Sequence, residues 1–402
     1  AAWNRPPRPD TPLGIYLHIP FCRKRCHFCY FRVYTGVNSK QVRTYVDGAI
    51  KELELYAKQP FIGGRKPTFI YFGGGTPSFL STQQLTSITE QMKAVLPWDE
   101  AEEITFECEP GTLNEQKLKF IKELGVTRLS LGVENYDADI LEFNGRAHRA
   151  VEIHRAYEWA QACDFPQINI DLIAGMLNET PENWQTCVAK AIDMAPDSVT
   201  IYQMEIPYNT TIYQRMKENN EIAAPVADWD TKREWVKYAF GELEANGYTV
   251  TSATTAVRDP ATKFVYRDKL WEGADLMSLG VASFSHVNGT HYQNEHHMDG
   301  YLERLERDEL PIYRALTPTD EELMIRELIL QFKLGVVRLG YFREKFDVDI
   351  TDRFAGQLMA MSKQGVLETD DTQLRLTRDG LMQVDWLLHD FFLEKHRNQR
   401  YA

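Results

Sequence analysis

The sequence predicts an α/β protein: a parallel sheet closed or partly closed into a barrel, followed by a smaller α-rich unit. Three observations support this fold class. Strand-like apolar runs alternate six times with helical segments between residues 14 and 203, the connections are short and carry Gly or Asn, and the rhythm changes from about Ala223. Such alternation is typical of βαβ units, whose strands run parallel.

Six segments carry the strand pattern, at 14–19, 68–72, 103–107, 127–132, 167–173 and 197–203. The segments between them carry apolar residues at helical spacing, at 39–56, 81–96, 114–124, 138–145, 150–162 and 182–194. Ser81 or Thr82 is the expected N-cap of the second helix. Ligands of such folds bind at the carboxyl ends of the strands, so we expect one face of the protein to collect the chemistry.

After the barrel, we expect a helix at 229–246 and a strand at 248–253. A separate α-rich unit follows, with helices at 318–332, 339–346, 350–364 and 380–392 and a two-stranded candidate at 366–376. Helices followed by a short hairpin suggest a winged-helix-like shape. We therefore predict four parts: an N-terminal arm (1–12), a barrel (13–222), an extension (223–316) and a C-terminal domain (317–402).

Composition argues against several classes of protein. The net charge of −13 argues against nucleic acid as the main partner. No apolar run reaches about 18 residues, so no membrane-spanning helix is expected, and residues 1–12 lack the apolar core of a secretory signal. We therefore expect a cytoplasmic protein, without a membrane partner, whose Cys108, Cys163 and Cys187 are free thiols.

Three more cysteines, Cys22, Cys26 and Cys29, directly follow the first strand with the spacing C-x3-C-x2-C. Thiolates this close in a reducing compartment are more often metal or redox ligands than disulfide partners. Three of them on one loop suit a [4Fe-4S] cluster whose fourth iron stays open to a non-protein ligand. The alternative is structural zinc with His27 or His18 as fourth ligand, although no second ligand pair follows.

Glycines and charged residues follow the next strands. Gly74 and Gly75 lie in Gly-Gly-Gly-Thr-Pro, which lacks the spacing of a dinucleotide fold and the Lys of a P-loop. Glycine lets a backbone approach a ligand closely, although a tight turn explains the run equally well. Asp171 stands inside an apolar strand, where a carboxylate needs a partner.

Together these motifs resemble the radical S-adenosylmethionine (SAM) superfamily, whose cysteine loop has this spacing and an aromatic residue at the position of Phe28. Within it, the chain is similar to the oxygen-independent coproporphyrinogen III dehydrogenase subfamily, which includes the bacterial haem chaperone and certain methyltransferases and cyclopropane-forming enzymes. The matching segments are 16–22, 72–77, 128–133, 170–173 and 279–285.

The resemblance implies two cofactors, a [4Fe-4S] cluster on Cys22, Cys26 and Cys29, and SAM. Tyr16 would contact the cofactor, and the first SAM would be bound by Gly74, Gly75, Thr76, Glu107, Arg146 and Asp171. A second SAM would lie near the 279–285 stretch, at Gly280, Val281 and Ala282. Reduction of the cluster by a partner such as flavodoxin or ferredoxin would cleave SAM to a 5′-deoxyadenosyl radical that attacks a small-molecule substrate. Glu134, Tyr202 and Gln203 are candidates for orienting that substrate.

Two departures separate the chain from the coproporphyrinogen enzyme: Phe31 replaces a further cysteine, and Glu134 replaces a glutamine. Cys29-Tyr30-Phe31 and the 266–271 segment also differ from the haem chaperone, although the pair His296-His297 leaves a haem-ligand role open. By elimination we expect SAM-derived one-carbon transfer, either methylation or cyclopropanation. The alternatives are oxidative decarboxylation of coproporphyrinogen III and, outside catalysis, haem delivery.

Overall fold

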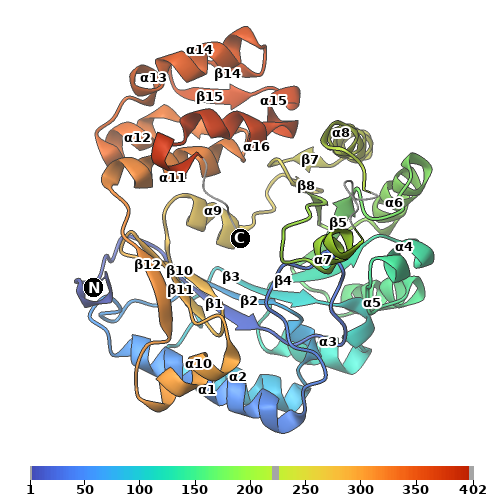
Figure 1. The fold of residues 1–402 in the computed structure, drawn as a ribbon, viewed down its shortest axis with the longest axis vertical. Coiled ribbons are helices and arrows are strands. Elements are labelled where there is room, and N and C mark those ends of the chain that lie inside the picture. Colours follow the sequence, from blue (N-terminus) through green and yellow to red (C-terminus); the bar gives the residue numbers. More distant parts are fainter. Residues whose placement is uncertain (1, 220–225, 398–402) are drawn as a thin grey trace.

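The computed structural model describes residues 2–219 and 226–397 (Figure 1), and a twelve-stranded sheet forms their centre. The strands lie in the order β12-β11-β10-β9-β1-β2-β3-β4-β5-β6-β8-β7. The six predicted strands are present and parallel: β1 (Leu13–Ile19), β2 (Phe69–Gly74), β3 (Glu103–Cys108), β4 (Arg128–Glu134), β5 (Gln167–Ala174) and β6 (Ser198–Gln203). The predicted partial (β/α)6 barrel is therefore confirmed.

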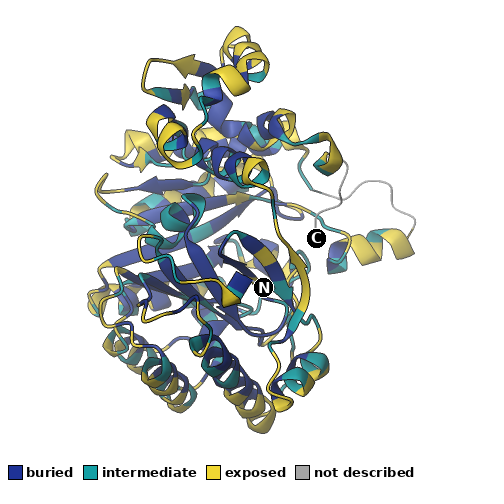
Figure 2. Ribbon diagram, turned by 90° about the vertical axis from the view of Figure 1, so that its left-hand side faces the viewer, coloured by how far each residue is buried: buried dark blue, intermediate teal, exposed yellow. Residues whose placement is uncertain are grey.

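The predicted helices connect these strands: α1 (Ser39–Ala57), α2 (Thr82–Val95), α3 (Glu115–Glu123), α4 (Ala138–Phe143), α5 (Ala150–Ala162) and α6 (Pro181–Met194). Ser81 is the N-cap of α2, and its side chain accepts from the Gln84 backbone N–H. Burial follows the strands and the inner faces of the helices, while the outer faces of the helices are exposed (Figure 2).

The sheet continues past β1 with four strands that the sequence analysis did not predict. These are β9 (Asp275–Leu279), which runs parallel to β1, and the antiparallel β10 (Phe284–Val287), β11 (Thr290–Asn294) and β12 (Ile312–Leu316). β9 contains a carboxylate, Asp275, that is fully buried because Arg65 and the Asn288 backbone N–H hydrogen-bond to it, each at 2.8 Å. Polar residues of this kind obscure the apolar pattern of a strand.

At the other edge lie β8 (Thr255–Val257) and β7 (Thr249–Val250), preceded in the chain by α7 (Thr211–Glu218) and α8 (Trp229–Ala245). Of the two remaining helices, α9 (Val265–Trp271) connects β8 to β9, and α10 (Met298–Glu306) connects β11 to β12. The strand predicted at 248–253 is wrong beyond two residues. The chain turns back at once instead, with the Thr251 N–H donating to the Thr255 carbonyl at 2.9 Å.

The C-terminal part (orange to red in Figure 1) is α-rich, as predicted. Its helices are α11 (Asp320–Phe332), α12 (Leu339–Phe346), α13 (Ile350–Arg353), α14 (Ala355–Lys363), α15 (Arg378–Met382) and α16 (Val384–Leu387). The predicted hairpin, β14 (Leu367–Thr369) and β15 (Gln373–Leu376), gains a third strand, β13 (Val336–Arg338). The helix predicted at 350–364 is broken at Phe354 (φ −117°, ψ 26°), and the one predicted at 380–392 is divided after Met382.

The four-part division of the chain stays a prediction. Its boundary between residues 222 and 223 lies outside the described residues. No helix in the described ranges combines the length and the apolar character needed to cross a bilayer.

Candidate functional site

The cysteine loop leaves β1 at Ile19 and closes on itself. The Cys22 N–H donates to the Tyr34 carbonyl (3.1 Å), and the Tyr34 N–H donates to the Pro20 carbonyl (2.7 Å). Inside this ring, the Cys29 N–H donates to the Cys26 carbonyl (3.2 Å). The three cysteines are free and half-buried, so the fold presents three thiols from one short, tied loop.

Two of the three sulfur atoms accept hydrogen bonds from other elements. Thr76 Oγ1 donates to the sulfur of Cys22 at 3.3 Å, and Arg146 Nη1 donates to that of Cys26 at 3.4 Å. Burial raises the pKa of Cys22 to about 11 and that of Cys29 to about 12. Thiolates here therefore need added positive charge, which cluster iron would supply. This donor set fits a [4Fe-4S] cluster.

The zinc alternative fits less well. His27 Nδ1 is engaged by the Phe143 carbonyl at 2.9 Å, and His18 lies 3.3 Å from the Tyr16 hydroxyl. No three His, Cys, Asp or Glu side chains among the residues in the described ranges are close enough together to hold one ion.

The glycines after β2 are required by close packing. Gly74 has φ +111°, and a Cβ there would lie 2.5 Å from the His18 ring. A Cβ on Gly75 would lie 2.9 Å from the Ile19 carbonyl and 3.0 Å from the sulfur of Cys22. The run therefore brings β2 against the cysteine loop, as a close backbone approach predicts.

The predicted acidic residues gather at neighbouring strand ends. Glu107 of β3 accepts from the Tyr71 hydroxyl (2.6 Å) and from the Gly74 N–H (3.1 Å). Asp171 of β5 accepts from Ser130 Oγ and Asn169 Nδ2, both at 2.9 Å. These donors supply the hydrogen bonds that a carboxylate inside a strand needs.

Glu134 ends β4 with φ +64° and lies 3.4 Å from Arg146 Nη2. Burial raises the pKa of Glu107 and of Glu134 to about 7 in each case. Arg146 also donates to the Gly132 carbonyl at 2.6 Å, and its Nε is buried without a partner. An orphaned guanidinium N–H beside the cysteine loop suits an anionic group such as the carboxylate of SAM.

Tyr202 and Gln203 end β6, the last parallel strand of the barrel. The Tyr202 side chain is 49% exposed. The ring of Phe28, the aromatic residue of the loop, packs against the small cluster Ile140, Ile173, Met176 and Met204. Tyr16 stacks on Tyr71, with ring centroids 5.7 Å apart.

The Gly280–Ala282 turn follows β9 beside β1, but its backbone donors are already engaged. The Gly280 N–H donates to Glu52 at 2.8 Å, and the Ala282 N–H donates to the Glu295 carbonyl at 2.7 Å. Val281 is fully buried. The turn is therefore packed into the protein, and these contacts give no support to a second SAM on its backbone.

Glu52 is a functional-site neighbour that was not expected from the sequence. This α1 carboxylate is fully buried and accepts from Gly280, Asn294 Nδ2 (2.6 Å) and the Tyr301 hydroxyl (2.7 Å). It therefore joins α1 to three later segments. Its only signal in the sequence is an acidic residue beside the apolar stripe of α1.

Burial raises the pKa of Glu52 to about 7. A carboxyl whose pKa is higher in the folded state contributes stability below its unfolded pKa and loses that contribution as pH rises through its folded pKa. In Glu52→Gln, we expect the loss of unfolding free energy between pH 5 and pH 8 to be smaller than in the wild type by about 2–3 kcal/mol. Urea unfolding of cofactor-free protein at both pH values measures this, with Glu54→Gln on the same helix as control. If the unfolding free energy of Glu52→Gln changes with pH as much as that of the wild type, the pKa assigned to Glu52 is wrong.

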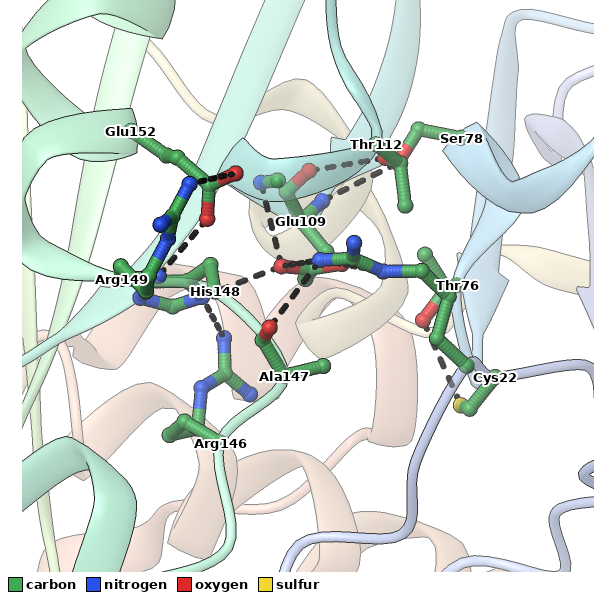
Figure 3. Close-up of polar contacts among 12 residues, drawn as sticks. Cys22, Thr76, Ser78, Glu109, Thr112, Arg146, Ala147, His148, Arg149 and Glu152 are labelled. Carbon is green, nitrogen blue, oxygen red and sulfur yellow. Dashed lines mark hydrogen bonds and ion pairs between the residues drawn. The ribbon is translucent and has the colours of Figure 1, made fainter.

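A second unpredicted group supports the cysteine loop (Figure 3). Glu109 accepts from both Nε (3.1 Å) and Nη2 (2.9 Å) of Arg23, the residue after Cys22. The His148 Nδ1 lies 3.2 Å from Glu109, and Arg146 Nη2 lies 3.4 Å from the same ring. The buried carboxylate of Glu109 therefore contacts Arg23, which follows Cys22, and reaches Arg146, which donates to Cys26, through the ring of His148.

Comparison with known proteins agrees with this geometry. The family model described as "Radical SAM superfamily" matches residues 16–191, and the model described as "HemN C-terminal domain" matches residues 319–382. The haem chaperone HemW of Bacillus subtilis is 26% identical over 371 residues, which cover 91% of this chain and 95% of that protein. The oxygen-independent coproporphyrinogen III oxidase of Synechocystis is 26% identical over 389 residues, covering 92% and 81%.

Among solved structures, coproporphyrinogen III oxidase (HemN) of Escherichia coli superposes with a TM-score of 0.83 at 22% identity, covering 97% of this chain and 92% of that one. The fold is therefore shared along nearly the whole chain. The chain thus carries a radical SAM domain followed by a HemN C-terminal domain, the organisation of a radical SAM enzyme of the HemN and HemW type. The family implies a [4Fe-4S] cluster and SAM as cofactors.

Proposed function

We propose that this radical SAM enzyme oxidatively decarboxylates a porphyrinogen of the coproporphyrinogen III type. The observation that carries the proposal is end-to-end similarity. Relatives named for this reaction match 92% of the chain or more, through the barrel, the extension and the C-terminal domain. The one-carbon transfer expected by elimination finds no such support, because these relatives are named for porphyrinogen oxidation or haem delivery.

In this proposal, Cys22, Cys26 and Cys29 hold the cluster. Thr76 and Arg146 hydrogen-bond to the ligating sulfurs. The free Nε of Arg146 would bind the carboxylate of SAM, and Glu107 and Asp171 would bind its ribose. When bound, the cluster and SAM supply a 5′-deoxyadenosyl radical.

Exposed aromatic rings follow the last cluster cysteine and end a neighbouring strand. Tyr30 and Phe31 follow Cys29, stack with centroids 4.6 Å apart, and are 50% and 42% exposed. Tyr202 lies at the end of β6. Exposed aromatic faces suit contact with pyrrole rings. In this enzyme, Phe31 would contact the substrate at the position where the coproporphyrinogen enzyme has a cysteine.

The test uses coproporphyrinogen III deuterated at the β-carbons of its propionate side chains, with reconstituted enzyme, SAM and dithionite. A propionate becomes a vinyl group when the 5′-deoxyadenosyl radical takes a hydrogen atom, a one-electron acceptor takes the remaining electron, and CO2 leaves. Deuterium should therefore appear in 5′-deoxyadenosine. No S-adenosylhomocysteine should form. Cys26→Ser serves as the control. If the 5′-deoxyadenosine carries no deuterium and S-adenosylhomocysteine forms, the proposal is rejected in favour of one-carbon transfer.

Haem delivery is the second candidate, favoured by the similarity to HemW over 95% of that protein. The His296 and His297 rings, 4.3 Å apart, offer imidazoles for haem iron. Tight haem binding with a Soret shift, lost in His296→Ala/His297→Ala, and no deuterium transfer would favour this function over decarboxylation.

A further inference from the structure

The cysteine loop stands out by its charge. Residues 11–46 contain six Lys or Arg residues and no Asp or Glu, in a chain of net charge −13. Three of the six, Arg23, Lys24 and Arg25, lie between the first two cluster cysteines. Arg23 is paired with Glu109, whereas Arg25 donates to two backbone carbonyls, those of Cys29 (3.1 Å) and Asn209 (3.0 Å).

A second basic element is fastened to this loop. The Asn209 side chain donates to the Tyr30 carbonyl (2.8 Å), and the Ile212 N–H at the start of α7 donates to the His27 carbonyl (3.1 Å). α7 carries Arg215 and Lys217 in its last turn. The hydrogen bond from Ile212 therefore joins to the loop a helix that carries two more cations.

Most of these cations have no carboxylate partner among the described residues. Within residues 2–219 and 226–397, Lys24, Arg25, Arg215 and Lys217 form no ion pair. Exposed cations elsewhere do, as Lys66, Lys237 and Arg343 show. We call these four residues the basic face. Unpaired like charges on one face raise the local potential and favour an oppositely charged partner.

We propose that the basic face is the docking surface for an acidic one-electron carrier protein that reduces the cluster. Lys24 and Arg25 stand between Cys22 and Cys26 in the chain, so a protein docked there lies close to the ligating sulfurs. One electron leaves the reduced carrier and enters the cluster, with no atom transferred. Because the net charge of the chain is −13, the protein as a whole repels an acidic carrier, and a local group of unpaired cations favours docking at that place. This inference is independent of the substrate named above.

The test uses flavodoxin as the probe and the double variant Lys24→Glu/Arg215→Glu. Binding of oxidised flavodoxin to the wild type should weaken steeply between 50 and 300 mM salt, because exposed charges are screened over about 10 Å. The double variant should bind at least about ten-fold more weakly and show a correspondingly slower bleaching of the cluster by reduced flavodoxin. Reduction by dithionite, which needs no docked protein, should be unchanged.

The matched control is Lys363→Glu/Arg375→Glu, which changes the net charge equally through two exposed residues of the C-terminal domain. It should bind flavodoxin like the wild type. Iron content and circular dichroism report on folding, and Lys24→Gln/Arg215→Gln replaces the reversal if cluster loading falls. Three results would overturn the proposal. The two double variants could weaken flavodoxin binding equally, Lys24→Glu/Arg215→Glu could bind flavodoxin like the wild type, or the wild type could fail to bind flavodoxin.

Discussion

Replacing Cys26 by Ser should abolish SAM cleavage, with a loss of at least about a thousand-fold in 5′-deoxyadenosine formation. The three thiols come from one loop, and no other cysteine lies on it, so a lost ligand has no substitute. Serine also leaves Arg146 Nη1 without the sulfur that it contacts. Anaerobic reconstitution followed by iron and sulfide analysis measures the cluster directly, apart from activity.

The control for this variant is Cys163→Ser, a half-buried free cysteine at the end of α5. It should bind wild-type amounts of iron and cleave SAM normally. Wild-type iron content and turnover in Cys26→Ser would show that the loop does not hold the cluster in the proposed way.

Replacing Arg146 by Lys should weaken SAM binding about a hundred-fold. The guanidinium donates to the Gly132 carbonyl and to the sulfur of Cys26 and pairs with Glu134, while its Nε stays free. A lysine ammonium is a single point charge and cannot satisfy this planar set of contacts. Breaking a buried charged contact costs about 3 kcal/mol, which corresponds to that loss.

Calorimetric titration of SAM into reconstituted protein measures the effect. Arg149→Lys is the control, because Arg149 stands three residues along the chain, is exposed, and pairs with Glu152 rather than with the cysteine loop. Unchanged affinity in Arg146→Lys, or equal loss in both variants, would remove Arg146 from the proposed SAM site.

The predicted barrel matched the structure because its signals are local. Each parallel strand is buried on both faces and therefore reads as a continuous apolar run, as in β5, where Asp171 is the one charged residue. The caps of the helices are local too, as at Ser81. The cysteine loop was identifiable for the same reason, since its ligands lie within eight residues of each other.

The extension of the sheet was not predictable in this way. β10 and β11 contain His, Ser, Thr and Gln, and they form strands because their partners supply backbone hydrogen bonds. Phe354 likewise reads as a helix interior residue, yet its backbone breaks the helix as its ring packs against Phe391, with centroids 5.3 Å apart. Such contacts join residues distant in sequence and leave no periodic signal.

The sequence by itself determined the superfamily, the parallel barrel, and the three cysteines with the glycines and acidic residues at the strand ends. Only the tertiary structure decided what surrounds them. It showed that Glu52 ties up the Gly280 turn, that Glu109 joins Arg23 to His148, and that α7 brings Arg215 beside the loop. The reason is physical: ligand spacing and strand burial are properties of short segments, whereas the partner of a buried charge is set by how distant segments pack.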